Sequence, residues 1–117
     1  MSTVPAPDPL VDRIARAQRE ARTRSERLRA LVPEMAAVLR GRGARRVWLF
    51  GSLVTGAQPH AGTDVDLCVE GLDDPSIADA TLALEELALA RVDLVRWEAA
   101  SARMRGRVER DGVEIGR

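Results

Sequence analysis

Residues 49–71 read LFGSLVTGAQPHAGTDVDLCVEG, and this stretch decides the fold. It begins inside a short apolar run, residues 47–50, which is bounded by an arginine and a glycine and therefore predicts a buried strand. Residues 56–63 contain two glycines and a proline and predict a loop. Residues 65–69 predict a second strand. The stretch thus predicts two strands joined through a loop, with polar groups gathered where the strands and the loop meet.

A Gly-Ser pair, Gly51–Ser52, directly follows the first strand. A glycine at this point lets the backbone approach a ligand closely because no Cβ is in the way, and the serine adds a hydroxyl donor. If residues 52–56 begin a short helix, its free N–H groups point at whatever lies above the strand. The arrangement suits a di- or triphosphate, although a Gly-Ser pair alone is a common turn.

Three aspartates accompany this turn. Asp64 and Asp66 lie two residues apart at the second strand, so both are expected on one face of the sheet, about 6–7 Å apart. Carboxylates this close repel by about 2–3 kcal/mol at an effective dielectric constant of about 20, and a divalent cation such as Mg²⁺ removes the conflict. Asp93 lies within the apolar segment 91–95, where a charge needs a partner or a metal. Together the three predict a cluster that holds two metal ions about 3.5–4 Å apart, as in two-metal phosphoryl transfer.

Simpler interpretations of these residues stay open. Asp64 and Asp66 would also suit two solvated carboxylates at a strand end, and Asp93 a strand-edge charge paired with Arg91 or Arg96. The single histidine, in the predicted loop, has no second histidine with which to form a zinc site.

The N-terminal part of the chain is rich in arginine. Residues 2–9 hold three prolines and predict a loose tail, whereas residues 10–31 show a helical pattern with seven arginines. The apolar seam of this helix is rich in alanine and is interrupted by Arg24. A solvated helix that docks lightly on the domain is therefore favoured over a nucleic-acid arm, with a dimer or partner contact as a third alternative.

The rest of the chain alternates helices with short strands. Pro33 suits the first position of a new helix, so we expect a tail and arginine-rich helix over residues 1–32 and the main domain over 33–117. Further elements are predicted as a helix after residues 73–76, a strand over 92–95, a helix over 99–110 and an edge strand over 113–115. The order indicates an α+β fold, a small sheet flanked by helices.

Composition narrows the classes of function. The chain has 117 residues and no net charge, so bulk charge gives no argument for binding nucleic acids or membranes. All 18 basic residues are arginines, which removes lysine-dependent Schiff-base and Walker-type chemistry. Tyrosine is absent, so a tyrosine acceptor would belong to another chain. With one cysteine, no signal-peptide pattern and no apolar run near about 18 residues, we expect a soluble cytoplasmic protein.

The Gly-Ser turn, the Asp-Val-Asp-Leu segment 64–67 and the Val-Asp-Leu-Val segment 92–95 together resemble the nucleotidyltransferase superfamily that includes DNA polymerase β. Over residues 33–117 the chain is similar to its minimal nucleotidyltransferase branch, both in Arg-Val-Trp-Leu-Phe before the turn and in Arg-Gly-Arg-Val-Glu-Arg-Asp-Gly-Val near the end. The resemblance implies a polymerase-β-like fold with a small mixed sheet and, here, an extra N-terminal helix.

The resemblance also implies roles for the site. Asp64 and Asp66 would hold Mg²⁺ ions that bridge a triphosphate, and Asp93 would hold the ion that activates an acceptor hydroxyl and serve as its base. The implied nucleotide-binding residues are Gly51, Ser52 and Thr63. The implied donor is ATP, used with two Mg²⁺ ions, and the implied acceptor is a tyrosine hydroxyl of a HEPN-type toxin, for which the chain serves as antitoxin.

Two departures from the family pattern bear on activity. Eleven residues, 53–63, separate the motif serine from Asp64, one more than is usual, and Thr55 stands where many relatives carry a basic residue. Two other functions therefore stay open: an antitoxin that neutralises its toxin by binding alone, and a nucleotidyltransferase that acts on RNA through the arginine-rich helix. A homo-oligomer formed through that helix is a further alternative.

Overall fold

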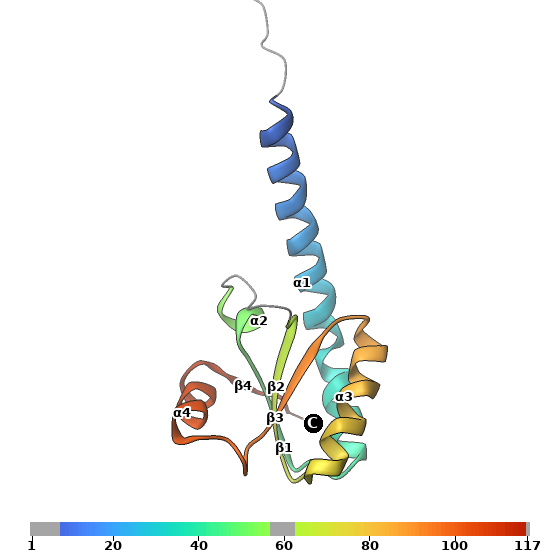
Figure 1. The fold of residues 1–117 in the computed structure, drawn as a ribbon, viewed down its shortest axis with the longest axis vertical. Helices are drawn as coiled ribbons and strands as arrows, with labels where there is room; N and C mark the ends of the chain where they lie inside the picture. Colours follow the sequence, from blue (N-terminus) through green and yellow to red (C-terminus); the bar gives the residue numbers. More distant parts are fainter. Residues whose placement is uncertain (1–7, 57–62, 117) are drawn as a thin grey trace, which may run out of the picture.

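The computed structural model describes residues 8–56 and 63–116. In chain order the elements within these residues are α1 (Pro9–Gly41), β1 (Arg46–Phe50), α2 (Ser52–Thr55), β2 (Val65–Glu70), α3 (Asp74–Ala88), β3 (Val92–Arg96), α4 (Ala102–Asp111) and β4 (Val113–Glu114). The strands form one sheet in the order β3-β2-β1-β4, in which β2 and β3 are parallel and the other neighbours antiparallel (Figure 1). The predicted α+β class with a small mixed sheet is confirmed.

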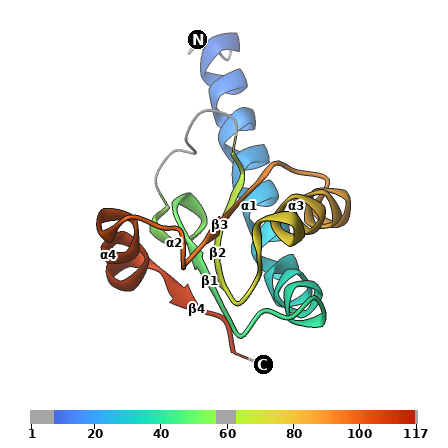
Figure 2. The ribbon, with the colours of Figure 1, turned by 60° about the horizontal axis from the view of Figure 1, so that its bottom comes forward.

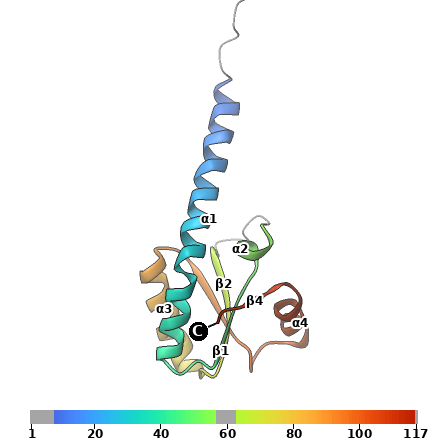
Figure 3. The ribbon, with the colours of Figure 1, turned by 180° about the vertical axis from the view of Figure 1, so that it is seen from behind.

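Alternate residues of the strands feed two apolar clusters, one on each face of the sheet. The larger cluster lies on the face covered by α1 and α3, and the smaller one on the face covered by α4 (Figures 2 and 3). In the smaller cluster Trp48 stacks on Trp97 with ring centroids 5.0 Å apart. Because Val65 and Leu67 belong to the larger cluster, Asp66 between them faces the α4 side.

Helix α1 runs without interruption across Pro33, so the predicted new helix at Pro33 is wrong. The start signal is instead Asp8–Pro9: the Asp8 carboxylate accepts a hydrogen bond from the Leu10 N–H at 2.9 Å, and the proline occupies the first turn. A proline inside a helix costs about 3 kcal/mol. Pro33 is exposed, and on the other side of α1 the buried residues between Leu28 and Leu39 pack on the sheet. Their burial, about 1.5–3 kcal/mol per large side chain, offsets that cost.

The N-terminal half of α1 extends beyond the sheet (Figures 1 and 3). Leu10, Val11 and Ile14 are 55, 58 and 49% exposed, so the apolar seam predicted over this half is not buried within the chain. A nucleic-acid arm and a dimer or partner contact stay predictions for this half of the helix. Within the described residues, no helix combines the length and the apolar character needed to cross a membrane.

The other element boundaries follow local signals. α4 begins at Ala102 and not at residue 99, because the Ser101 hydroxyl accepts a hydrogen bond from the Met104 N–H at 3.1 Å and caps the helix there. The Asp73 carboxylate caps α3 in the same way by accepting from the Ser76 N–H at 2.9 Å. The predicted edge strand is the two-residue β4, which pairs with β1.

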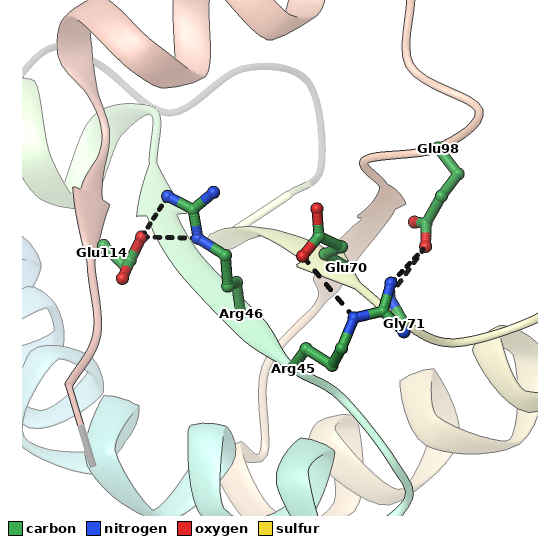
Figure 4. Close-up of polar contacts among 6 residues, drawn as sticks. All are labelled: Arg45, Arg46, Glu70, Gly71, Glu98 and Glu114. Carbon is green, nitrogen blue, oxygen red and sulfur yellow. Dashed lines mark hydrogen bonds and ion pairs between the residues drawn. The ribbon is translucent and has the colours of Figure 1, made fainter.

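Charged side chains meet where β1 begins and β2 ends, at the opposite end of β1 from the β1–α2 turn (Figure 4). Nε and Nη2 of Arg46, on β1, donate to Oε1 of Glu114, on β4, at 2.9 and 2.5 Å. Nη2 of Arg45 lies 3.9 Å from Oε2 of Glu98. Burial disfavours the ionised form of Glu98, yet backbone N–H groups, including that of Gly71 at 2.8 Å, and nearby guanidinium groups hold the pKa of Glu98 below its usual value. Exposed pairs of this kind contribute about 0–1 kcal/mol each, so they add little to the stability of the fold.

Candidate functional site

Asp66 and Asp93 occupy paired positions on neighbouring strands. β2 and β3 are parallel, and Asp66 lies directly opposite Asp93 in their register. The residues that flank each aspartate are buried against α1 and α3, so both carboxylates lie on the α4 face of the sheet. Adjacent strands are about 4.8 Å apart, which makes the two aspartates neighbours. Asp66 is partly buried, whereas Asp93 is exposed.

Gly51 places the β1–α2 turn against Asp66. Its backbone has φ 77° and ψ −152°, a conformation that is essentially restricted to glycine. A Cβ at this position would lie 2.2 Å from Oδ2 of Asp66 and 2.9 Å from its Cγ. The Asp66 carboxylate therefore occupies the space that any other residue at position 51 would fill. The group that lies against this glycine is the chain's own aspartate, and the close approach of a ligand to Gly51 stays a prediction.

Asp64 is turned toward α1. Its Oδ2 accepts a hydrogen bond from the Arg91 N–H at 3.0 Å and forms an ion pair with Nη2 of Arg24 at 2.8 Å. The Asp64 side chain is only 16% exposed, whereas that of Arg24 is 54% exposed. Across residues 8–56 and 63–116, no group of three or more His, Cys, Asp or Glu side chains is arranged to hold a metal ion. The three predicted carboxylates therefore do not form a metal-binding cluster among the described residues, and the guanidinium of Arg24 stands where the sequence predicts a cation for Asp64.

A cleft of about 670 Å³ separates α1 from the start of α2 and β2. Ser52 and Asp64 line it on the side of the domain, and Arg22, Arg24 and Arg29 line it on the side of α1. The cleft therefore joins one predicted nucleotide-binding residue and one predicted carboxylate to three arginines of the N-terminal helix.

Sequence reasoning missed the part that α1 plays here. A signal was present, because Arg24 interrupts the apolar seam at a position where the helical spacing calls for a buried side chain. A charged residue on an otherwise apolar stripe indicates a partner on a neighbouring element. The identity of that partner, Asp64, depends on how α1 crosses the sheet and is not visible in the local pattern.

The other predicted site features have mixed outcomes. Thr63 is partly buried at the start of the segment that leads to β2, and its nucleotide-binding role stays a prediction. The predicted loop over 56–63 lies largely outside the described residues, as does the effect of its extra residue. Arg96, one alternative partner for Asp93, instead donates to the Leu72 carbonyl at 2.7 Å and to Asp74 at 3.0 Å.

Neither the family models nor the curated proteins include a match to the chain. Among solved structures, one assigned as a minimal nucleotidyltransferase is 33% identical and superposes with a TM-score of 0.60, over 75% of this chain and 95% of the other. The chain belongs to the minimal nucleotidyltransferase family.

Two further structures bear on this minimal nucleotidyltransferase. A toxin–antitoxin structure with AMP-PNP matches with 27% identity and a TM-score of 0.59, over 68% of this chain and 67% of that one. The second contains a tri-AMPylated Shewanella oneidensis HEPN toxin in complex with its MNT antitoxin. It matches with 20% identity and a TM-score of 0.57 over 80% of this chain and 70% of that one, and so supports the fold alone.

The cysteine of this minimal nucleotidyltransferase is not poised for chemistry. Cys68 lies two residues after Asp66 on the same face of β2, fully buried beside Trp48 and Phe50. Burial raises the pKa of the Cys68 thiol to about 11, so the reactive thiolate is scarce at neutral pH. The residue therefore serves as a small apolar member of the core.

Proposed function

We propose that this minimal nucleotidyltransferase transfers AMP from ATP to a tyrosine hydroxyl of a HEPN-type partner protein and thereby acts as its antitoxin. The observation that carries the proposal is the Asp66–Asp93 pair, which is held in register on two parallel strands beneath the Gly51 turn. Family membership supports nucleotidyl transfer, and the toxin–antitoxin relative with AMP-PNP supports an adenosine triphosphate donor and an antitoxin role.

The acidic side chains suit Mg²⁺, which prefers carboxylate oxygens together with the oxygens of a bound phosphate. Asp64, Asp66 and Asp93 would hold it, once Asp64 leaves Arg24. The ion would supply charge neutralisation on the triphosphate and would lower the pKa of the acceptor hydroxyl. Gly51 fits this assignment, because the absence of a Cβ lets the Asp66 carboxylate lie directly below the turn.

The chain's own residues then bind the phosphates, orient the acceptor and deprotonate its hydroxyl. Gly51 and Ser52 would bind the outgoing phosphates, since Ser52 lines the cleft beside Asp64. Asp93 is exposed, so an acceptor hydroxyl carried by another protein can reach it. The acceptor oxygen forms a bond to the α-phosphorus, the bond to the pyrophosphate oxygen breaks, and the hydroxyl proton passes to the Asp93 carboxylate. No residue of this chain can be the tyrosine acceptor, because the chain has no tyrosine.

Mass spectrometry of a HEPN-type partner tests the proposal after incubation with ATP, Mg²⁺ and the full chain. We expect one or more AMP additions, and Asp66→Asn should reduce labelling at least about 100-fold, the order of effect of a lost electrostatic group in a phosphoryl-transfer site. Glu70→Gln is the matched control, because Glu70 lies on the same strand and the same face as Asp66 but at the other end of β2. Unlabelled partner with the wild-type chain, or equal labelling by Asp66→Asn, would overturn the proposal.

An antitoxin that acts by binding alone is a second candidate, and the Arg24–Asp64 ion pair is the observation that favours it. The pair occupies a carboxylate that the enzymatic function requires. This candidate predicts that a chain carrying both Asp64→Ala and Asp66→Ala still neutralises the partner's ribonuclease activity. Under the enzymatic function the same chain loses neutralisation together with labelling.

A further inference from the structure

Two arginines of α1 hold this helix against the domain through hydrogen bonds to backbone carbonyls. Nη1 of Arg27 donates to the Ala88 carbonyl at 2.9 Å, and Nε of Arg29 donates to the Leu53 carbonyl at 2.8 Å. Ala88 is the last residue of α3, so the guanidinium of Arg27 meets a carbonyl at a helix C-terminus, where positive charge is favoured, and Leu53 lies in the short helix α2. These contacts hold the middle of α1 over the start of β2.

Arg24 lies one helical turn before Arg27 and is thereby placed at the site. Its guanidinium reaches Asp64, yet more than half of its side chain is exposed, and it lines the cleft together with Ser52. Asp64 does not depend on Arg24 for its orientation, since the same oxygen accepts the Arg91 N–H at 3.0 Å. Arg24 can therefore leave Asp64 without leaving the carboxylate unbound.

A guanidinium is suited to both states of such a site. Its planar set of donors matches a carboxylate and a phosphate equally well, and it stays charged at every physiological pH. Within the cleft Arg24 and a divalent cation would compete for Asp64, whereas Arg24 and a triphosphate would attract each other. A ligand that carries both the cation and the phosphates resolves the competition by exchanging partners.

We propose that Arg24 is an exchangeable counter-ion of the nucleotide site. Without nucleotide it neutralises Asp64, and when a nucleoside triphosphate enters with Mg²⁺ it moves to the phosphates and leaves the Asp64 carboxylate to the cation. The inference rests on the proposed function, and it makes α1 a wall of the binding site. Arg24 thus has opposite effects on two ligands: it weakens the binding of a divalent cation alone and strengthens the binding of the nucleotide.

Calorimetry and EPR on the full chain test whether Arg24 has these opposite effects on nucleotide affinity and on cation affinity. AMP-PNP with Mg²⁺ is titrated by calorimetry, and Mn²⁺ alone is followed by EPR, so neither readout depends on turnover. For Arg24→Gln we expect nucleotide affinity to fall about 10-fold, the effect of one lost charge-assisted hydrogen bond. Mn²⁺ affinity should rise about two- to five-fold, the effect of removing one partly exposed ion pair.

Arg13→Gln is the matched control, because it removes the same charge from an exposed position on the same helix, near its N-terminus. It should leave both affinities unchanged, and Arg24→Lys, which keeps the charge but not the planar fork, should give an intermediate nucleotide affinity. If the wild-type chain binds AMP-PNP and Arg24→Gln binds it equally well, or if Mn²⁺ affinity falls, the inference is overturned while the proposed function stands. A wild-type chain that binds no AMP-PNP overturns both.

Discussion

Replacing Gly51 by alanine tests whether the β1–α2 turn is built around Asp66. The glycine has φ 77° and ψ −152°, which a residue with a Cβ adopts only under strain. The added Cβ would also lie 2.2 Å from Oδ2 and 2.9 Å from Cγ of Asp66, far inside van der Waals contact. The variant must therefore strain its backbone and displace the Asp66 carboxylate, so it should be less stable and its site should be distorted.

The expected loss follows from these two costs. A residue held in a glycine-only region costs of order 1–3 kcal/mol, and a side chain forced from a packed position adds about 1 kcal/mol. A total of about 3 kcal/mol is thus expected. An unfolding entropy of about 2.1 cal/mol/K per residue gives roughly 0.25 kcal/mol/K for 117 residues, so the Tm should fall by about 12 °C.

Thermal unfolding followed by circular dichroism measures this change, and Gly56→Ala serves as the control. Gly56 also has a positive φ, 76°, but a Cβ added there meets no atom within 4 Å. It should therefore lose only about 1 kcal/mol, or about 4 °C. An Asp66→Ala background removes the clash with Oδ2 and Cγ and leaves the contact with the Asp66 Cβ at 3.2 Å, so Gly51→Ala should cost about 1 kcal/mol less than in the wild type. A Gly51→Ala midpoint within about 2 °C of the wild type would refute the reasoning, as would an undiminished cost in the double variant.

Three further outcomes follow from the structure. Leu39→Ala should lower the free energy of unfolding, measured with denaturant, by about 2–5 kcal/mol because Leu39 is fully buried. Leu10→Ala, on the exposed half of α1, should change it by less than about 0.5 kcal/mol. Equal effects would contradict the division of α1 into a packed and an exposed half. Cys68 should resist Ellman's reagent at pH 8 until the chain is unfolded, because its pKa is raised to about 11 and the thiol is buried; rapid labelling of the native chain would show that the α4 face is open. The Ser76 hydrogen bonds lower the pKa of Asp73 from 3.8, so the stability that this carboxylate contributes is present above that pH and is lost as the pH falls through the folded value. Asp73→Ala should therefore lower the Tm at pH 7, and the Tm difference from the wild type should shrink below pH 3.8. A Tm difference that does not change with pH would argue against the cap.

The strands and the turn could be predicted because each depends on a local pattern. The apolar run of β1 ends at Gly51 and β2 ends before Gly71, and the spacing of Val65 and Leu67 in β2 already placed Asp66 opposite the core face. The pairing of Asp66 with Asp93 is a different matter, because alternation predicts the face of a strand but not its register against a neighbour. That register depends on the length of α3 and of the turns around it.

In helix α1, tertiary packing decides the course of the helix against the local sequence pattern at Pro33. A proline at position 33 favours a helix start when the sequence is considered alone, but the apolar face from Leu28 to Leu39 continues across it and is buried as one surface. The ion pair between Arg24 and Asp64 is likewise a product of the crossing of α1 over β2. Neither feature follows from a window of neighbouring residues.

The Arg24–Asp64 ion pair also reduces the repulsion among the carboxylates near the β1–α2 turn. Three aspartates around one turn repel one another, and a chain of zero net charge with no lysine has only its arginines to compensate them. Arg24 does so from another element, and with Asp64 only 16% exposed the pair is less screened than a surface ion pair. The ion pair therefore lowers the negative charge around the turn, and under the proposed function the same arginine would already be in place when phosphates arrive. A zero net charge thus does not argue against binding a triphosphate, because affinity depends on where the arginines of α1 lie and not on their sum.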